Sequence, residues 1–201
     1  MSAVEPSARD VILAAVRQAR PPAVARVEAP APVPLSAGVA NSARADAFTA
    51  AAVVSGADVT ACSRGDAARV VEAALGGARS VVSFADGIPS RGALSGDLHE
   101  LADLDAFVCE TTLGVAENGA VWIASSSDRL RAALFLAARV VVVVLESDLV
   151  DDLHAAYARI DVTAHPFGAF VAGPSKTADI EQSLVIGAHG PKAFSIVLVR
   201  S

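Results

Sequence analysis

Aromatic side chains are scarce in this sequence: Phe, Trp and Tyr make up 4% of the 201 residues, whereas hydrophobic residues as a whole make up 53%. A chain of this length forms one domain of ordinary size and buries a single large core. Because large rings are few, that core must be built mainly from Ala, Val and Leu side chains.

Cysteine is nearly absent, since Cys62 and Cys109 are the two in the sequence. They fall in separate predicted strands, and neither belongs to a Cys-x-x-Cys pair or has a histidine nearby. Zinc sites and iron–sulfur clusters need several clustered ligands, and this spacing indicates neither. We therefore interpret both residues as buried thiols and expect no metal site in this chain.

Clusters of basic residues and long apolar segments are also lacking. The net charge of −6 argues against a general nucleic-acid binder, because such proteins neutralise phosphates with clustered Lys and Arg. The N-terminus has no basic segment followed by a long apolar run, which excludes an ordinary secretory signal. The apolar segment 139–145 is far too short to cross a bilayer. We therefore expect a cytoplasmic protein.

The N-terminal residues 1–38 differ in composition from the rest of the chain. Residues 7–20 have apolar side chains at helical spacing and basic ones outside, which predicts a short amphipathic helix. Pro21 and Pro22 end it, and a Pro/Ala-rich linker follows. We interpret residues 1–38 as an appendage before an α/β domain over 39–201. A docking arm for a partner and a disordered tail are both compatible with this pattern.

From residue 42 onward, predicted helices and strands alternate. The helices are expected over 42–55, 66–75, 128–138 and 149–160, and the strands over 58–62, 80–84, 107–109, 140–145, 170–172 and 194–199. The nearly unbroken Val run in 140–145 is typical of a strand buried on both faces in a parallel sheet. Asn118-Gly119 between two apolar runs predicts one β-hairpin. The sequence therefore predicts a three-layer α/β fold with a mostly parallel sheet and one hairpin.

The segment 173–181, Gly-Pro-Ser-Lys-Thr-Ala-Asp-Ile-Glu, lies between two predicted strands and leads into a further expected helix. Free N–H groups at a helix start, the helix dipole and one lysine make an anion-binding seat. The ligand-binding candidates here are Gly173, Ser175, Lys176, Thr177 and Asp179. Ser, Thr and Asp are also the residues that cap helices, so a purely structural role stays open.

Residues 173–181, together with Gly-Ala-His-Gly-Pro at 187–191, resemble the C-terminal signature of the LUD domain family (DUF162), of the short lactate-utilisation protein C type. A second patch, 116–121, is similar to the family's Ala-Glu-Thr-Gly segment, with Asn118 where Thr is usual. This match adds Asn118 and Gly119 as candidate ligand contacts. The resemblance implies a fold similar to that of ribose-5-phosphate isomerases, CoA-transferases and formyltetrahydrofolate cyclo-ligases.

The resemblance also implies a role in the oxidation of L-lactate to pyruvate, beside partner subunits that contain iron–sulfur clusters. Removing two electrons from lactate needs a flavin, nicotinamide, haem or cluster, and this sequence shows a motif for none. We therefore expect a non-redox component that has no cofactor of its own and binds a small anionic metabolite. The alternative is a stand-alone enzyme of the isomerase/CoA-transferase-like class, acting on a phosphorylated or acyl-CoA substrate.

Glu117 at the hairpin and His189 in the Gly-His-Gly-Pro turn are the catalytic candidates, because a carboxylate and an imidazole serve acid–base chemistry. In the stand-alone enzyme, Glu117 would be the base or nucleophile. Each has a structural alternative: a solvated turn carboxylate for Glu117, and a turn-holding hydrogen bond for His189. His165 precedes a proline ahead of the signature and has no required role. The site hypothesis requires that the corner at Glu117 and the turn at Lys176 lie at the same mouth of one sheet.

Overall fold

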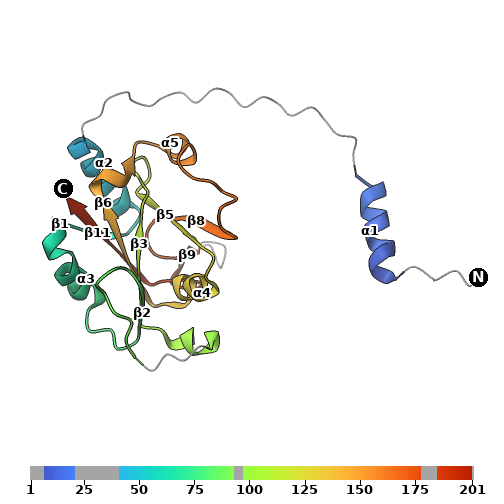
Figure 1. Cartoon of the computed structure of the whole chain (residues 1–201), viewed down its shortest axis with the longest axis horizontal. Helices are drawn as coiled ribbons and strands as arrows, with labels where there is room; N and C mark the ends of the chain where they lie inside the picture. Colours follow the sequence, from blue (N-terminus) through green and yellow to red (C-terminus); the bar gives the residue numbers. More distant parts are fainter. Residues whose placement is uncertain (1–6, 21–40, 93–96, 178–184, 201) are drawn as a thin grey trace, which may run out of the picture. The chain divides into compact units, whose positions relative to one another are not determined.

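The computed structural model describes residues 7–20, 41–92, 97–177 and 185–200 (Figure 1). The chain divides into two units, Met1–Val33 and Pro34–Ser201. In the first unit the described part is α1 (Ala8–Gln18), whose first turn is capped by the Ser7 hydroxyl accepting from the Asp10 N–H. Within the described ranges, every helix is too short or too polar to traverse a bilayer.

In the described part of the second unit, five parallel strands form a central sheet in the order β1-β11-β6-β3-β2. These strands are β1 (Asp58–Ser63), β2 (Val81–Phe84), β3 (Ala106–Thr111), β6 (Arg139–Leu145) and β11 (Ala193–Arg200). Val140, Val141 and Val142 of the central strand β6 are fully buried although they alternate between the two faces. The prediction of a strand covered on both sides is therefore confirmed.

A second, mixed sheet has the strand order β7-β4-β5-β8. Its strands are β4 (Gly114–Val115), β5 (Ala120–Ser125), β7 (Leu149–Val150) and β8 (Phe167–Val171). β4 and β5 are antiparallel and joined by residues 116–119, so the predicted hairpin is confirmed. Gly119 has a φ of +69°, and its N–H donates to the Val115 carbonyl, which closes the connection.

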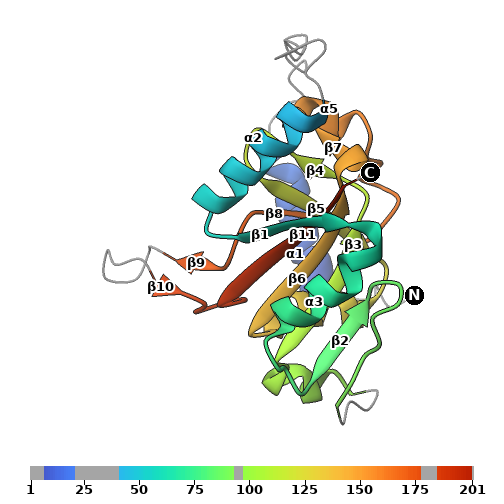
Figure 2. The same ribbon diagram turned by 90° about the vertical axis from the view of Figure 1, so that its left-hand side faces the viewer.

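The layers are held together by two apolar clusters, one on each face of the parallel sheet. α3 (Ala67–Leu75) covers one face, whereas α2 (Asn41–Val54), α4 (Asp128–Leu136) and residues of the mixed sheet cover the other. Figure 2 shows α2 and α3 on different sides of the edge formed by β1. α5 (Leu153–Tyr157) packs on the outer face of the mixed sheet beside Trp122 and Phe170. The predicted three-layer α/β fold is therefore confirmed.

The helix predicted over residues 149–160 is shorter than expected. Leu149 and Val150 instead form β7, which pairs in parallel with β4 and buries both side chains. Asp152 then caps α5, because its carboxylate accepts a hydrogen bond of 2.7 Å from the Ala155 N–H. The helical periodicity was misleading here, since pairing with a strand distant in sequence overrode it.

The signature segment also departs from its predicted structure. Lys176–Thr177 forms β9, which pairs antiparallel with β10 (Val185–Ile186), so the backbone there is extended and does not enter a helix. The placement of Lys176 and Thr177 at a helix entrance is therefore wrong. The expected helix itself falls on residues 178–184, and these, including Asp179, lie outside the described residues.

Candidate functional site

The hairpin corner and the signature segment both contact the C-terminal end of α2. The Lys176 ammonium donates a hydrogen bond to the Ser55 carbonyl, and the Ser55 hydroxyl donates to the Asn118 carbonyl at 3.4 Å. Gly173 packs so closely that an added Cβ would overlap the Ser55 carbonyl. The structure thus brings Asn118, Gly173 and Lys176 together, but through main-chain contacts that stabilise the fold.

Gly119 is buried against the backbone of α2. A Cβ added at this position would overlap the main chain of Ala52, and the φ of +69° is itself unfavourable for other residues. No room for a ligand remains between Gly119 and the helix. The structure therefore gives this predicted ligand contact a packing role.

Ser175 joins the two halves of the signature. Its N–H donates to the Pro191 carbonyl at 2.9 Å, and its carbonyl accepts from the Gly187 N–H at 2.9 Å. An added methyl group at Gly190 would lie 3.0 Å from the Ser175 Cβ. The segments 173–177 and 187–191 therefore fold as one bonded unit beside the start of β11.

Glu117 and His189 lie in different parts of the unit. The Glu117 carboxylate is exposed and accepts a hydrogen bond of 3.1 Å from the Leu153 N–H, so it helps to cap α5. His189 is also exposed, but it lines a groove of about 760 Å³ beside α4 and the start of β11. The structure therefore does not place the two predicted catalytic side chains against one reacting group.

The groove at His189 combines cationic and apolar side chains. Phe135 and Leu136 are each 47% exposed there, and Lys192 lines it as well. On its other wall, the Asp105 carboxylate accepts from the N–H groups of Arg79 and Ser80. Within the described part of the chain, the side chains of His189 and Lys192 make no hydrogen bond or ion pair.

Two neighbouring cavities lie at the carboxyl end of the parallel sheet, on either side of the segment that follows β3. Glu110, Thr111 and Thr112 line both. One, of about 320 Å³, is bordered by the first turn of α3 and by Arg64. The other, of about 300 Å³, opens toward the mixed sheet. In α/β proteins ligands bind outside the carboxyl ends of parallel strands, so these cavities occupy the expected location.

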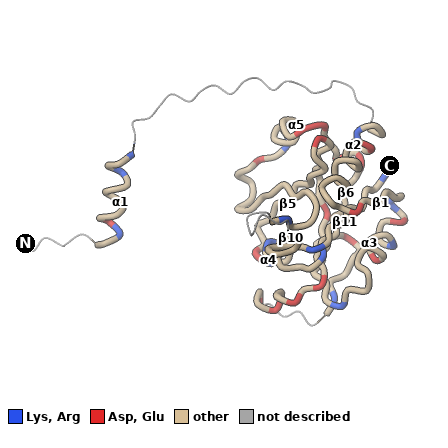
Figure 3. The backbone as a smooth tube through the Cα atoms, turned by 180° about the vertical axis from the view of Figure 1, so that it is seen from behind, with Lys and Arg blue, Asp and Glu red and all other residues tan. Residues whose placement is uncertain are grey.

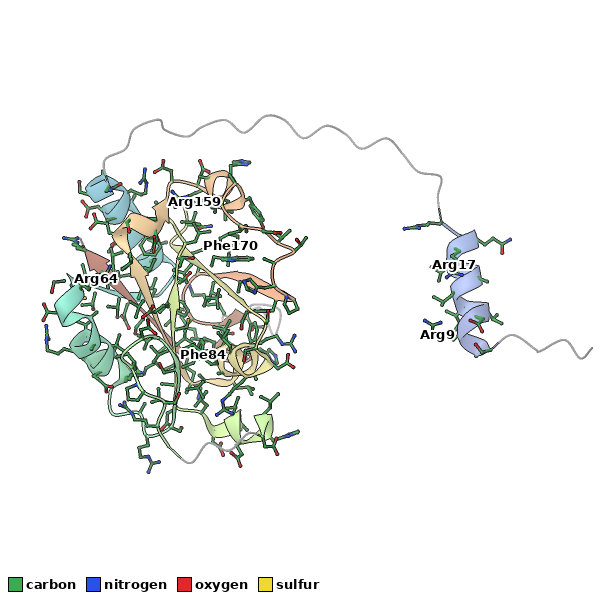
Figure 4. The ribbon with its side chains drawn as sticks, viewed as in Figure 1. Arg9, Arg17, Arg64, Phe84, Arg159 and Phe170 are labelled. Carbon is green, nitrogen blue, oxygen red and sulfur yellow. The ribbon has the colours of Figure 1, made fainter. Side chains whose placement is uncertain are left out.

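The 300 Å³ cavity, called the Arg159 cavity below, brings together residues from three separate segments. Its polar lining residues are Glu110, Thr111, Thr112, Arg159, Asp161 and His165, and its apolar lining residues include Leu113, Trp122 and Ala124. Within the described residues, the Arg159 guanidinium makes no hydrogen bond or ion pair. Its positive charge nevertheless acts to lower the pKa of the Asp148 carboxyl. Figure 4 shows Arg159 and Phe170 in the same region of the unit, on the side of the mixed sheet.

Most other polar groups of the Arg159 cavity already have partners. The Asp161 carboxylate accepts from the Thr163 hydroxyl at 2.6 Å and the Thr163 N–H at 2.8 Å, and these bonds lower the pKa of Asp161. The Thr111 hydroxyl donates to the Trp122 carbonyl, and one oxygen of Glu110 accepts from the Asp86 N–H at 3.0 Å. Arg159 is therefore the positively charged residue of this cavity whose side-chain N–H groups are available to bind a ligand.

Acidic side chains surround this cation. Figure 3 shows acidic positions along the segments that flank α5. Burial raises the pKa of Asp148, and the positive charge of Arg159 acts in the opposite direction. His165 contacts the Ser126 hydroxyl through Nδ1 at 3.3 Å. A ligand that binds Arg159 in this cavity therefore lies near the carboxylate of Asp161.

Sequence reasoning did not identify the Arg159 cavity. The sequence pattern singles out no role for Arg159 and requires none of His165. The available signal was the Glu110-Thr111-Thr112 segment at the end of a predicted strand, since strand ends are where such folds place ligands.

The two cysteines are far apart. Cys62 is in β1 and Cys109 in β3, with β11 and β6 between them, so they are separated by at least about 14 Å at ordinary strand spacing. Cys109 is buried as predicted, whereas Cys62 is only half-buried. Across the residues that the structure describes, no group of three or more His, Cys, Asp or Glu side chains is arranged to hold a metal ion.

Comparisons with known proteins match a large part of the second unit. Residues 76–199 match the family model of the LUD domain. "Lactate utilization protein C" from Geobacillus kaustophilus is 32% identical over 117 residues, which cover 55% of this chain and 48% of that protein. The protein of the same name from Bacillus subtilis is 34% identical over 106 residues, covering 50% and 43%. The chain spans about half the length of the curated relatives it matches.

A solved structure has the same fold. The crystal structure of a DUF162 family protein from Deinococcus radiodurans aligns with a TM-score of 0.58 and 21% sequence identity. The alignment covers 81% of this chain and 99% of that one. The arrangement of strands and helices described above is therefore shared with that protein.

Proposed function

The chain belongs to the LUD domain family, and we propose that it is a non-redox component of a cytoplasmic lactate-utilisation system in which it binds a small anionic metabolite. The relatives named for lactate utilisation support the metabolic role. The observation that supports ligand binding is the Arg159 cavity at the carboxyl end of the parallel sheet.

The chemistry of this cavity suits a small carboxylate. A guanidinium presents paired N–H donors that match the two oxygens of a carboxylate, and Arg159 has these donors available. The cavity volume of about 300 Å³ lies at the lower end of the range for small-molecule sites. This volume corresponds to about ten water molecules, so a three-carbon acid such as lactate fits and leaves space for water.

Electron transfer in this proposal is assigned to partner subunits. Oxidation of lactate to pyruvate releases two electrons, which a protein passes to a redox cofactor. We propose that partners with iron–sulfur clusters accept them. Cys62 and Cys109 lie on strands too far apart to ligate one cluster, which supports placing the clusters in those partners.

Growth on L-lactate tests the proposal. Deleting the gene in its own organism is expected to abolish growth on L-lactate but not on glucose, and the full-length chain should restore it. An Arg159→Gln variant should fail to restore growth, whereas Arg64→Gln, the matched change in the neighbouring cavity, should succeed. Normal growth with Arg159→Gln at wild-type protein levels would rule out the proposed binding role of Arg159.

Affinity purification of the tagged full-length chain tests the partner assignment. We expect proteins with the absorption spectrum of iron–sulfur clusters to copurify from lactate-grown cells. The same purification from glucose-grown cells is the control. Absence of such proteins under gentle conditions, together with normal lactate growth of the tagged strain, would contradict the assembly with cluster-containing partners.

A further inference from the structure

The helix of the first unit, α1, has an exposed apolar face. Val11, Ile12 and Val16 are 54%, 62% and 61% exposed, although Val and Ile are among the residues that folded proteins most often bury. Within the described residues, α1 has no buried side chain. We propose that α1 binds the surface of an anionic lipid bilayer, with its apolar face in the bilayer interface. This contact is separate from the Arg159 cavity.

The apolar side chains form one continuous stripe along α1. At about 100° per residue, a sector of about 140° around the helix axis contains only apolar side chains. The members of this stripe are Ala8, Val11, Ile12, Ala15, Val16 and the C-cap residue Ala19. Leu13 lies outside the sector. A stripe of this width beside a charged face is typical of a helix that lies flat on an apolar surface.

The polar side of α1 is basic. Arg9, Arg17 and Arg20 are balanced by one acidic residue, Asp10, so the described part of the first unit has a net charge of +2. Figure 4 shows Arg9 near the start of α1 and Arg17 near its end. Within the described residues, the three guanidinium groups make no hydrogen bond or ion pair. They are therefore available to the phosphate groups of lipids.

Two of these arginines lie beside the apolar stripe. Arg9 is seven residues before Val16 and Arg20 is four residues after it, so helical periodicity places both along the same edge of the stripe. The alkyl part of an arginine rests on apolar surface while its guanidinium group stays in a polar layer. This edge of α1 therefore suits the boundary between the acyl chains and the headgroups of a bilayer.

The composition of the stripe favours a bilayer over a groove in another protein. Protein interfaces depend on a few anchor residues, enriched in Trp, Tyr and Arg, that fill shaped pockets. α1 has no aromatic residue, and the apolar side chains of its stripe are those of Val, Ile and Ala. A bilayer interface accepts such a stripe without a shaped pocket, and its anionic lipids attract the arginines.

The net charge is divided unevenly between the two units. Residues 1–33 contain four arginines and three acidic residues, a net charge of +1, so the remaining residues carry −7 of the total of −6. An anionic surface therefore attracts the first unit and repels the second. By chain length alone, the twenty residues 21–40 can span several times the Debye length of about 8 Å. The acidic unit therefore does not have to approach the lipid.

Cosedimentation of the full-length chain with lipid vesicles tests the proposal. Vesicles of equal parts phosphatidylglycerol and phosphatidylcholine are compared with vesicles of phosphatidylcholine alone. We expect the chain to bind the anionic vesicles at least about tenfold more tightly, because each arginine near an anionic surface adds binding energy that neutral lipid does not supply. Raising the salt concentration should weaken this binding, since salt screens the attraction between the arginines and the lipid.

Substitutions in the stripe test the orientation of α1. Ile12→Ser combined with Val16→Ser removes two of the three large side chains of the stripe and should weaken binding to anionic vesicles at least about tenfold. Leu13→Ser is the matched control, because Leu13 lies outside the stripe, and it should leave binding unchanged. A loss with Leu13→Ser as large as that of the double variant would overturn the proposed orientation.

Substitutions of arginine test the attraction to anionic lipid. Arg9→Gln combined with Arg20→Gln removes the charge of +2 and should reduce the affinity to about that for phosphatidylcholine alone. Arg64→Gln combined with Arg200→Gln removes the same charge from the second unit and should leave binding unchanged. Equal binding of the wild type to the two kinds of vesicle would overturn the assignment of an anionic surface.

Two further outcomes would contradict the bilayer contact as a whole. Absence of the full-length chain from the pellet of anionic vesicles at low salt would overturn it. Sedimentation velocity without lipid measures self-association of the same chain. Self-association that Ile12→Ser combined with Val16→Ser abolishes would assign the apolar stripe to a contact with a second copy of the chain instead.

Discussion

The ammonium group of Lys176 donates a hydrogen bond to the main-chain carbonyl of Ser55, which follows the last residue of α2. This contact joins β9 to a helix more than one hundred residues earlier in the chain. The lysine of the family signature is thus engaged with the fold, and its cationic group is not directed at one of the carboxyl-end cavities.

We expect Lys176→Met to reduce the free energy of unfolding by about 1 kcal/mol, because one charge-assisted hydrogen bond is lost at an exposed position. Urea denaturation measures this change. Lys192→Met is the control, since within the described residues the Lys192 side chain makes no hydrogen bond. Equal stability of the wild type and Lys176→Met would mean that the contact contributes nothing in solution.

Gly119→Ala tests the close approach of the hairpin to α2. The positive φ alone costs about 1 kcal/mol for a residue with a Cβ, and the overlap with the Ala52 main chain adds to it, so a loss of about 3 kcal/mol is expected. Gly77→Ala is the matched control, because Gly77 has a φ of +80° but open space around it. Thermal unfolding measures the stability of both variants. Equal losses of stability would show that α2 shifts to accommodate the added methyl group at no further cost.

Local sequence patterns sufficed for most of the parallel sheet and its helices. α2, α3 and β6 follow from periodicity and from the Val run, because each is decided by side chains within one segment. β7 and β9 were missed because their pairing partners are distant in sequence. A pattern that fits both a helix and a strand is resolved only when the partner strand is known.

The candidate site was less predictable than the fold. Glu110, Trp122 and Arg159 come from three segments, and their convergence depends on how the mixed sheet stacks against the parallel sheet. Nothing in the local sequence around Arg159 distinguishes it from a solvated arginine. The signature residues were easy to find, yet Ser175 and Lys176 are bonded to the main chain.

The two thiols should react at very different rates. Burial, with a smaller contribution from the charge of Glu110, raises the pKa of Cys109 to about 12, so almost no thiolate exists at pH 8. Burial and the nearby Asp66 also raise the pKa of Cys62, but this thiol is partly accessible. We expect an aromatic disulfide reagent at pH 8 to label Cys62 at least about a hundredfold faster than Cys109. Comparable rates in folded protein, checked with Cys62→Ser, would contradict the burial of Cys109.

Asp105 makes the stability depend on pH in the acidic range. Hydrogen bonds from the N–H groups of Ser80 and Arg79 hold the pKa of Asp105 below its ordinary value of 3.8. Because the pKa is lower in the folded state, this stabilisation is present above pH 3.8 and is lost as the pH falls through the folded-state value. Asp105→Asn should therefore have a lower Tm than wild type at pH 7, and the difference should shrink below pH 4. A constant difference across this range, with Asp46→Asn as the control, would contradict the linkage.

The last prediction separates capping from chemistry at Glu117. Asp152 is 5% exposed and caps α5 through the Ala155 N–H, whereas Glu117 is exposed and accepts from the Leu153 N–H. A buried cap is worth more than an exposed one, so we expect Asp152→Ala to cost about 1–2 kcal/mol and Glu117→Ala about 0.5 kcal/mol in urea denaturation. Glu117→Gln retains the accepting oxygen and should preserve both stability and lactate growth. Loss of lactate growth with Glu117→Gln at unchanged stability would instead assign this carboxylate the catalytic role that its sequence motif predicts.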